Sequence, residues 1–176
     1  MLVEGNNISI RRLQQQDDHL LAKWLSDPDV LAFYQGRDRP LDLVKVHDEF
    51  YSQENRIKRC IIEYQCQPIG YLQFYPLDEQ ERQVFQLEAN AVYGMDQFIG
   101  EPAFWGKGIG QTFVRMMAAY LINHESAKKV VVDPQQSNLR AIRCYEKCGF
   151  VKIKVLADHE WHEGDFRDCW LMEYTV

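Results

Sequence analysis

The sequence contains neither a long apolar run nor a basic stretch at its amino terminus. No segment approaches the ~20 apolar residues that a membrane-spanning helix needs. Residues 1–7 also lack the basic and apolar regions of a secretion signal. Both absences argue against a membrane partner and predict a soluble, cytoplasmic protein. Because 46% of the 176 residues are hydrophobic, one core can form, and we expect residues 1–176 to be a single domain.

Cysteine pairs with the spacing of metal sites are also missing. The five cysteines form an odd set without a C-x-x-C pair, which argues against a disulfide framework and a zinc ribbon. His159 and His162 are three residues apart, whereas the H-E-x-x-H motif of zinc peptidases places its histidines four apart. Cys144 and Cys148 could bind a metal, but small packing residues of a helix have the same spacing. We therefore expect no metal.

Positive charge is scarcer than negative charge. The chain has 20 basic and 26 acidic side chains and a formal net charge of −6. This balance argues against a nucleic-acid partner, whose phosphates a protein must neutralise. A cationic partner suits it better, although a mildly acidic protein needs no charged partner. The residues around His19, His47 and His124 do not suggest a serine or cysteine nucleophile, so covalent catalysis is not indicated.

Hydrophobic periodicity predicts a mixed α/β (α+β) chain. Strands are expected at residues 8–13, 59–64, 69–75, 84–99, 129–132, 151–156 and 169–174. Helices are expected after caps at Asp17-Asp18, Asp27-Pro28 and Ser137 or Asn138, over residues 41–51, and from Ile109. Three local expectations are a hairpin with a four-residue connection at residues 65–68, a bulge at Gly94, and a helix-ending Gly149.

Glycines cluster just before the helix predicted from Ile109. The segment Trp105-Gly106-Lys107-Gly108-Ile109-Gly110 would let backbone N–H groups and the positive helix end approach an anion, so a phosphate or diphosphate is the expected ligand. A Walker loop is excluded, because five residues separate Gly100 from Gly106 and Gly108 stands where Ser or Thr is needed. A dinucleotide fingerprint is excluded by its different glycine order. A tight turn without a ligand would have the same composition.

A second motif begins at the predicted helix cap Asn138. The pattern N-x-x-A-x-x-x-Y-x-x-x-G-F is matched by Asn138, Ala141, Tyr145, Gly149 and Phe150. Asn138 places an amide at the helix start and Tyr145 lies two turns along the same face, so both could reach one groove. Each also has a structural interpretation, Asn138 as a cap and Tyr145 as a core aromatic.

Taken together, the two motifs resemble the GNAT superfamily of acetyl-CoA-dependent acetyltransferases. Gly108 and Gly110 fit its signature Q/R-x-x-G-x-G/A, with Trp105 in the place of Gln or Arg. The resemblance implies the GNAT fold, a mixed and mostly antiparallel twisted sheet of about seven strands flanked by about four helices. It also implies acetyl-CoA as cosubstrate.

Within that superfamily, residues 92–102 are similar to a strand of the aminoglycoside 6′-N-acetyltransferases that carries the segment G-[IM]-D-Q. Gly94-Met95-Asp96-Gln97 occupies the corresponding positions. Residues 69–73, the pair Asp133-Pro134 and residues 159–174 are similar to further parts of these enzymes. The resemblance covers most of residues 58–176 and implies an aminoglycoside as the small-molecule partner.

Two residues are expected to carry the chemistry. A protonated amine cannot attack a thioester, so a carboxylate must orient it and remove a proton, and Asp96 is the candidate base. Asp96 could instead hold a cationic substrate without proton transfer, or simply solvate a turn. Tyr145 is the candidate that protonates or hydrogen-bonds the leaving thiolate.

The resemblance also implies binding sets. Acetyl-CoA is expected to contact Gln97, Phe98, Ile99, Trp105, Gly106, Lys107, Gly108, Ile109, Gly110, Gln111, Thr112, Asn138, Ala141 and Tyr145. The amine substrate is expected to contact Tyr34, Gln73, Asp96, Asp133, Glu160 and Asp168. Two other functions stay open, namely an N-acetyltransferase for another amine (a polyamine, a siderophore precursor or a protein lysine) and a non-catalytic acyl-CoA-binding domain. The choice between a monomer and a homodimer is also open.

Overall fold

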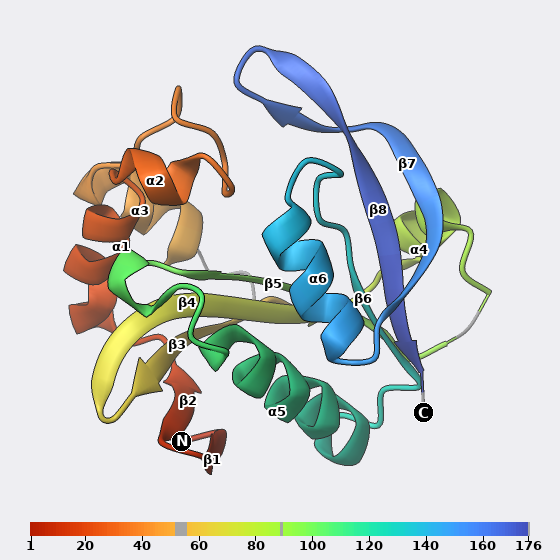
Figure 1. The fold of residues 1–176 in the computed structure, drawn as a ribbon, viewed down its shortest axis with the longest axis horizontal. Helices are drawn as coiled ribbons and strands as arrows, with labels where there is room; N and C mark the ends of the chain where they lie inside the picture. The colour runs from red at the N-terminus through yellow and green to blue at the C-terminus, as the bar shows by residue number, and fades with distance from the viewer. Residues whose placement is uncertain (52–55, 89, 176) are drawn as a thin grey trace. The chain divides into compact units, whose positions relative to one another are not determined.

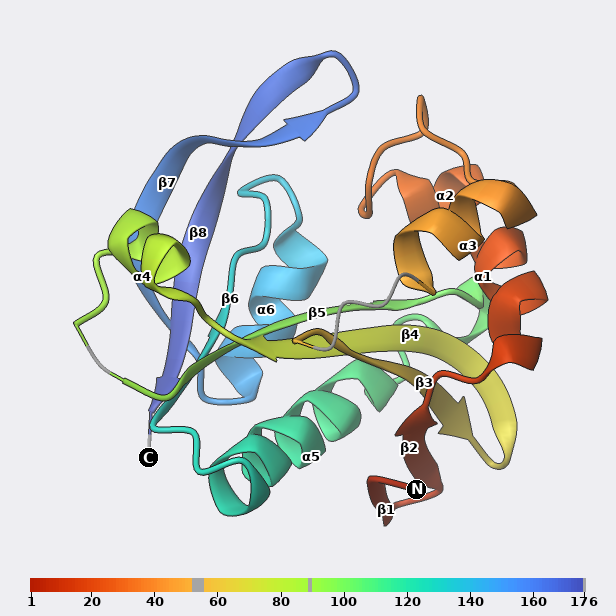
Figure 2. The same ribbon diagram turned by 180° about the vertical axis from the view of Figure 1, so that it is seen from behind.

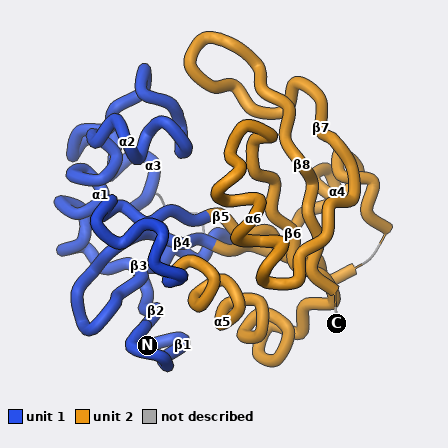
Figure 3. The backbone as a smooth tube through the Cα atoms, in the orientation of Figure 1, with its two compact units in different colours: residues 1–73, 97–109 blue, residues 74–96, 110–176 orange. Residues whose placement is uncertain are grey.

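The computed structural model describes residues 1–51, 56–88 and 90–175. The chain forms two compact units, each built from two stretches of sequence (Figure 3). Unit 1 comprises residues 1–73 and 97–109, and unit 2 comprises residues 74–96 and 110–176. The strands β4 (Gln67–Pro76) and β5 (Val92–Ile99) each begin in one unit and end in the other. The single domain expected from chain length stays a prediction.

The strands form a sheet in the order β1-β2-β3-β4-β5-β6-β8-β7 (Figure 1). Its other members are β1 (Val3–Gly5), β2 (Ile8–Arg12), β3 (Lys58–Tyr64), β6 (Lys129–Val132), β7 (Val151–His162) and β8 (Asp165–Thr175). Strands β5 and β6 are parallel, whereas β1–β2, β2–β3, β6–β8 and β7–β8 are antiparallel. The expected mixed, mostly antiparallel sheet is confirmed. It has eight strands within the described residues, and the unexpected one is the short β1.

Six α-helices lie within the described residues (Figure 2). They are α1 (Asp18–Trp24), α2 (Pro28–Leu31), α3 (Leu43–Phe50), α4 (Glu79–Phe85), α5 (Ile109–His124) and α6 (Leu139–Lys147), with 3₁₀ turns η1 (Gln15–Asp17) and η2 (Pro102–Phe104). No helix of this described chain has the length and apolar character that crossing a bilayer requires.

Three of the predicted helix boundaries are confirmed. Asp27 caps α2 by accepting a hydrogen bond from the Asp29 N–H at 2.9 Å, and Pro28 takes the first helical position. Asn138 caps α6 by accepting one from the Ala141 N–H at 3.1 Å. Gly149 follows α6 with φ +97°, a left-handed conformation that glycine adopts without steric cost.

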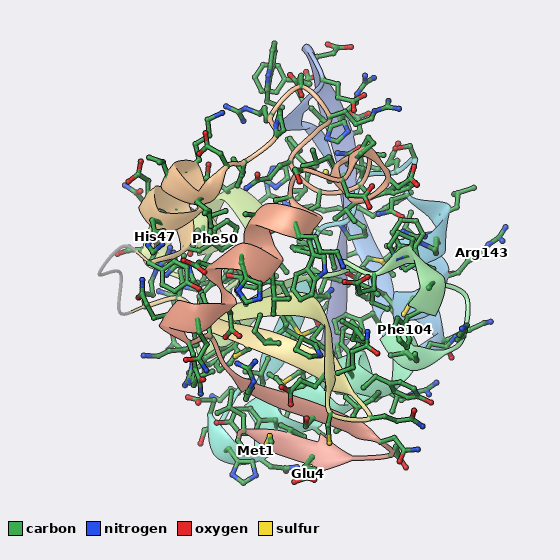
Figure 4. The ribbon with its side chains drawn as sticks, turned by 90° about the vertical axis from the view of Figure 1, so that its left-hand side faces the viewer. Met1, Glu4, His47, Phe50, Phe104 and Arg143 are labelled. Atoms are coloured by element: carbon green, nitrogen blue, oxygen red, sulfur yellow. The ribbon has the colours of Figure 1, made fainter. Side chains whose placement is uncertain are left out.

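Unit 1 is organised around a buried cluster that joins α1 and α3 to the strands. Trp24 of α1 and Tyr71 of β4 are completely buried, and the rings of Phe50 and Tyr71 meet edge to face with centroids 5.1 Å apart. Figure 4 looks onto this side of the molecule, with Phe50 and His47 labelled on α3. The His47 imidazole lies 2.9 Å from the Asp18 carboxylate, which ties α3 to α1.

Unit 2 has its own buried cluster between β4, β5, β6 and the β7–β8 hairpin. It consists of Leu77, Val92, Val131, Leu156, Cys169 and Leu171. At the other end of β6, the ammonium group of Lys129 contacts both carboxylate oxygens of Glu173 at 2.9 Å. This pairing lets a buried glutamate remain on β8.

Asp17 is the N-cap residue of α1, as predicted, but its side chain makes no capping hydrogen bond. Asp17 is 2% exposed and accepts two hydrogen bonds from the Arg11 guanidinium, at 2.7 and 2.9 Å. It also accepts the Gln14 N–H at 2.8 Å. A paired buried carboxylate is preferred here because Arg11, which also binds Glu63, would otherwise lack a partner for part of its charge.

Two segments differ from the sequence-based expectation. The β3–β4 hairpin turns over two residues rather than four, because Gln65 and Cys66 both adopt positive φ, +50° and +63°. The strand predicted for residues 84–99 begins only at Val92. Residues 84 and 85 instead end α4, whose first turn is stabilised by a capping box between Asp78 and Glu81.

Candidate active site

The glycine loop is open and exposed. Gly106 and Gly108 have φ values of +73° and +78°, and a Cβ atom added to either would meet nothing within 4 Å. The backbone of this loop therefore presents itself to solvent immediately before α5 begins at Ile109. An exposed glycine loop at a helix start, with Lys107 between the glycines, fits the negative charge of a diphosphate.

Trp105 anchors the loop from within unit 1. Its indole N–H donates a hydrogen bond to the Ile99 carbonyl at 2.8 Å, so the indole connects the loop to the end of β5. The Lys107 ammonium group lies 5.6 Å from the centroid of the Phe104 ring. Trp105, which occupies the place of a Gln or Arg in the family signature, thus has a structural task.

In unit 2, α6 packs against the first turn of α5. A Cβ atom on Gly110 would lie 3.5 Å from the Cys144 sulfur, and the Cys148 thiol lies 3.4 Å from the Gln111 carbonyl oxygen. The two cysteines therefore line the contact between these helices. Thr112 follows in the same turn of α5 and is half-buried.

The motif residues of α6 lie on one helix in unit 2, with Ala141 half-buried in its first turn. Asn138 uses its side-chain oxygen for the helix cap described above. Tyr145 is 8% exposed, and its ring packs against Phe150 with centroids 5.7 Å apart. The structural interpretations of Asn138 and Tyr145 thus hold for part of each side chain, and neither excludes a contact with a ligand.

The predicted contacts of unit 1 gather around Phe98 on β5. The Phe98 ring lies 4.7 Å from the ring of Tyr34 and 5.7 Å from that of Tyr71, between centroids. The Tyr71 hydroxyl donates a hydrogen bond to the Gln73 side chain at 2.8 Å. Tyr34, Gln73 and Phe98 are therefore connected through one aromatic cluster, in which Phe98 is part of the packing. The neighbouring Gln97 is half-buried.

Three carboxylates act on one phenol in unit 2. The Tyr75 hydroxyl hydrogen-bonds Asp96, and Asp133 and Glu81 are close enough to act on it electrostatically. Burial raises the pKa of the Tyr75 phenol far above its usual value, and the three negative charges raise it further. The structure thus brings the predicted Asp96 and Asp133 together around a residue that sequence reasoning did not select.

Asp133 also has a histidine neighbour. The His159 Nε2 atom lies 2.9 Å from an Asp133 carboxylate oxygen, and this hydrogen bond raises the pKa of His159 above 6.5. Burial opposes the shift, whereas the negative charges of Asp133 and Glu160 add to it. The other side of the imidazole faces the Phe85 ring of α4, with centroids 5.8 Å apart.

The two acids expected on the β7–β8 hairpin have local partners. Asp168 accepts a hydrogen bond from the Asp158 N–H at 3.0 Å, beside the register shift that separates Leu156 from Glu160. The Glu160 carboxylate lies 3.8 Å from the Cys169 sulfur. Asp168 therefore stabilises the irregular part of β7. Within the described residues, no group of three or more His, Cys, Asp or Glu could hold a metal ion.

Sequence reasoning did not predict that Tyr75, Glu81 and His159 lie beside the acidic group formed by Asp96 and Asp133. Gly94 was noticed, but for a bulge, and it pairs regularly with Val131 of β6. A Cβ atom on Gly94 would lie 2.7 and 2.8 Å from two ring atoms of Tyr75. The glycine therefore permits close approach of an aromatic ring, and only that packing reveals Tyr75.

Comparisons with known proteins identify the family of the chain. Residues 14–157 match the family model described as the acetyltransferase (GNAT) domain. The chain is 30% identical over 150 residues to aminoglycoside N(6′)-acetyltransferase type 1 of Klebsiella pneumoniae. The aligned region spans 83% of this chain and 75% of that protein.

Solved structures show the same fold. The aminoglycoside acetyltransferase AAC(6′)-Ib bound to ribostamycin and coenzyme A superposes with a TM-score of 0.83 at 26% identity, over 97% of this chain and 94% of that one. Spermidine N-acetyltransferase of Vibrio cholerae, bound to CoA and spermine, is similar in fold, with a TM-score of 0.76 at 18% identity over 97% and 96% of the two chains. The chain belongs to the GNAT acetyltransferase family.

Proposed function

We propose that this protein transfers an acetyl group from acetyl-CoA to the 6′-amine of an aminoglycoside antibiotic. The observation that carries the proposal is the gathering of Asp96, Asp133 and Glu81 around the Tyr75 hydroxyl. An aminoglycoside carries several ammonium groups, and carboxylates bind such groups by charge-assisted hydrogen bonds. The names of its relatives and the ribostamycin bound to a structural neighbour support this choice of substrate.

The proposed site for acetyl-CoA, which supplies the acetyl thioester, uses the glycine loop and α6. Backbone N–H groups of the exposed glycine loop and the positive end of α5 bind the diphosphate. Gln111 and Thr112 follow in the first turn of α5. From α6, Asn138 and Tyr145 contact the polar chain that leads to the sulfur.

Asp96 prepares the amine in this proposal. An ammonium group has no lone pair with which to attack a carbonyl carbon, so its proton moves first to the Asp96 carboxylate, directly or through a water molecule. The pairing of β5 with β6 covers Val92 to Gly94, while β5 continues to Ile99. In this proposal a backbone N–H near Gln97 donates a hydrogen bond to the developing oxyanion.

Tyr145 assists the leaving group. As the new C–N bond forms, the C–S bond breaks and the sulfur leaves with an electron pair. The Tyr145 hydroxyl donates a hydrogen bond or its proton to that sulfur. Because a thiol has a pKa of about 8.5, a thiolate can leave near neutral pH without this help. Loss of the Tyr145 hydroxyl should therefore cost less activity than loss of the Asp96 carboxylate.

A panel of amines tests the proposed substrate. The purified protein is given acetyl-CoA with kanamycin, tobramycin, spermidine or a lysine-containing peptide, and mass spectrometry locates the new acetyl group. Transfer to the 6′-amine of the aminoglycosides is expected. Transfer to spermidine or the peptide alone would assign a different amine. Tight CoA binding without turnover of any amine would indicate an acyl-CoA-binding domain instead.

Two variants test the assigned roles. We expect Asp96→Asn to lower kcat about 10²- to 10³-fold, because no other group on β5 replaces the base, and Tyr145→Phe to lower it about 10-fold. Steady-state kinetics with kanamycin measure both. Full activity in both variants would contradict the division of labour, even if the substrate is correct.

A further inference from the structure

Tyr75 reaches the acidic group because β5 has a glycine beneath its ring. A Cβ atom on Gly94 would lie 2.7 Å from Cε2 and 2.8 Å from Cζ of Tyr75, and 3.0 Å from its hydroxyl oxygen. These distances are shorter than a carbon atom tolerates, so any other residue at position 94 would displace the ring. The ring therefore packs closely against the β5 backbone at Gly94, two residues before Asp96.

The hydroxyl of Tyr75 is held among charges of one sign. It hydrogen-bonds Asp96, and its electrostatic neighbours are Asp133, which directly follows β6, and Glu81 of α4. Each of the other two carboxylates has a separate partner: Glu81 accepts the Asp78 N–H at 2.8 Å, and Asp133 contacts His159 at 2.9 Å. Tyr75 is thus the neutral donor that this group supplies to Asp96.

We propose that Tyr75 is a positioning residue for Asp96, whose hydroxyl donates to one carboxylate oxygen and thereby fixes the direction in which the other meets the amine. The inference takes the role of Asp96 from the proposed function, whereas the hydrogen bond between Tyr75 and Asp96 does not depend on that function. Tyr75 has no proton-accepting part in this scheme, because burial and the surrounding carboxylates keep its phenol protonated.

A hydrogen bond to the ionised form of an acid stabilises that form. A donated hydrogen bond from the Tyr75 hydroxyl therefore favours the ionised form of Asp96. It also restricts rotation of the carboxylate, and small errors in the placement of a catalytic group are costly for the rate. Removing the hydroxyl should affect kcat more than KM for the amine.

The test compares Tyr75→Phe with a matched control. Tyr75→Phe keeps the ring over Gly94 and removes only the hydroxyl. Tyr93→Phe makes the same chemical change on β5, three residues before Asp96. The Tyr93 phenol is half-buried and hydrogen-bonds Glu125 instead. Carbon NMR of labelled aspartates, with the Asp96 signal assigned from Asp96→Asn, follows the titration of Asp96 in each protein without requiring any substrate.

We expect the pKa of Asp96 to rise by about one unit in Tyr75→Phe and to stay unchanged in Tyr93→Phe. In kinetics with the amine identified by the panel above, kcat should fall on the order of 10-fold in Tyr75→Phe, and the acidic limb of kcat/KM should move to higher pH. An Asp96 titration that is identical in wild type and Tyr75→Phe would overturn the proposal.

The double variant Tyr75→Phe/Asp96→Asn separates action through Asp96 from action beside it. If Tyr75 acts through Asp96, the double variant has the kcat of Asp96→Asn alone. A further fall in the double variant would also overturn the positioning role. Should the wild type acetylate no amine, the proposed function fails, while the NMR titration still decides whether Tyr75 controls Asp96.

Discussion

Gly100 lies directly against the indole ring of Trp24. A Cβ atom on Gly100 would overlap three atoms of the ring, Cγ, Cδ1 and Cδ2. Trp24 is completely buried, and its indole N–H donates to the Glu101 carboxylate at 2.9 Å. The end of β5 therefore packs onto α1 without room for a side chain at position 100. The hydrogen bond between Trp24 and Glu101 holds the indole in this position.

Replacing Gly100 with alanine should destabilise the protein. The added methyl group must push Trp24 from its site, and overpacking of this kind lowers the free energy of unfolding by about 1–3 kcal/mol. Urea denaturation of Gly100→Ala measures the loss. Gly110→Ala is the control, since its Cβ would make an ordinary 3.5 Å contact with Cys144. Equal unfolding midpoints for Gly100→Ala and wild type would contradict the packing described.

The Asp17–Arg11 pair should make stability depend on acidity. Burial raises the pKa of Asp17, but hydrogen bonds from Arg11 and the Gln14 N–H outweigh it, so the pKa lies below 3.8. A depressed folded-state pKa means that the pair stabilises the protein above pH 3.8 and that the contribution is lost as the pH falls through the folded value. Asp17→Asn should cost about 3 kcal/mol at neutral pH.

Urea unfolding at neutral pH and at pH below 3.8 checks this expectation. The difference between Asp17→Asn and wild type should shrink in acid, because wild-type Asp17 is then protonated as well. A difference that stays constant over this range would mean that Asp17 does not act through its charge.

The His159–Asp133 pair should have the opposite pH dependence. Its hydrogen bond raises the pKa of His159 above 6.5, so the pair contributes fully below pH 6.5 and loses its contribution as the pH rises through the folded value. We expect about 1 kcal/mol, since both side chains are partly exposed. Thermal unfolding of His159→Gln should differ from wild type most in mild acid. Asp133→Asn should lose the same pH dependence of stability. If its stability depends on pH as that of the wild type does, the His159–Asp133 pair is not the cause of that dependence.

Replacing Gly108 should weaken CoA binding, whereas replacing another exposed glycine with positive φ should not. Gly108 and Gly164 share positive φ, +78° and +85°, and open space around a Cβ, but Gly164 lies in the turn between β7 and β8. Alanine at either position should cost about 1 kcal/mol of stability. Only Gly108→Ala should weaken CoA, by about 10-fold or more in calorimetry, because the methyl group stands where the diphosphate approaches. Equal CoA affinity in the two variants would place the diphosphate elsewhere.

Much of the fold could be predicted because its signals are local. The cap at Asn138, the stop at Gly149 and the start of α2 at Asp27 depend on residues within one turn of each other. The predictions failed where two groups compete for the same side chain. Asp17 has the composition of a helix cap, but Arg11 is six residues earlier on β2 and binds its carboxylate more strongly than a backbone N–H does.

The candidate site was predictable where a motif carries it. The glycine loop, Asn138, Tyr145 and Asp96 each stand in a recognisable pattern, and the loop is as open as the pattern requires. Tyr75 stands in none. It is an aromatic residue at the end of a strand, and only the pairing of β4 with β5 places its hydroxyl beside Asp96.

The order of residues alone indicated the family, the mixed sheet and the open glycine loop that we propose for a diphosphate, since each depends on short patterns whose geometry the backbone itself enforces. The tertiary structure decided which carboxylates share a phenol, that His159 pairs with Asp133, and why position 94 is glycine. These relationships join strands and helices that are distant in sequence. Charge and close packing act through space, so no local pattern records them.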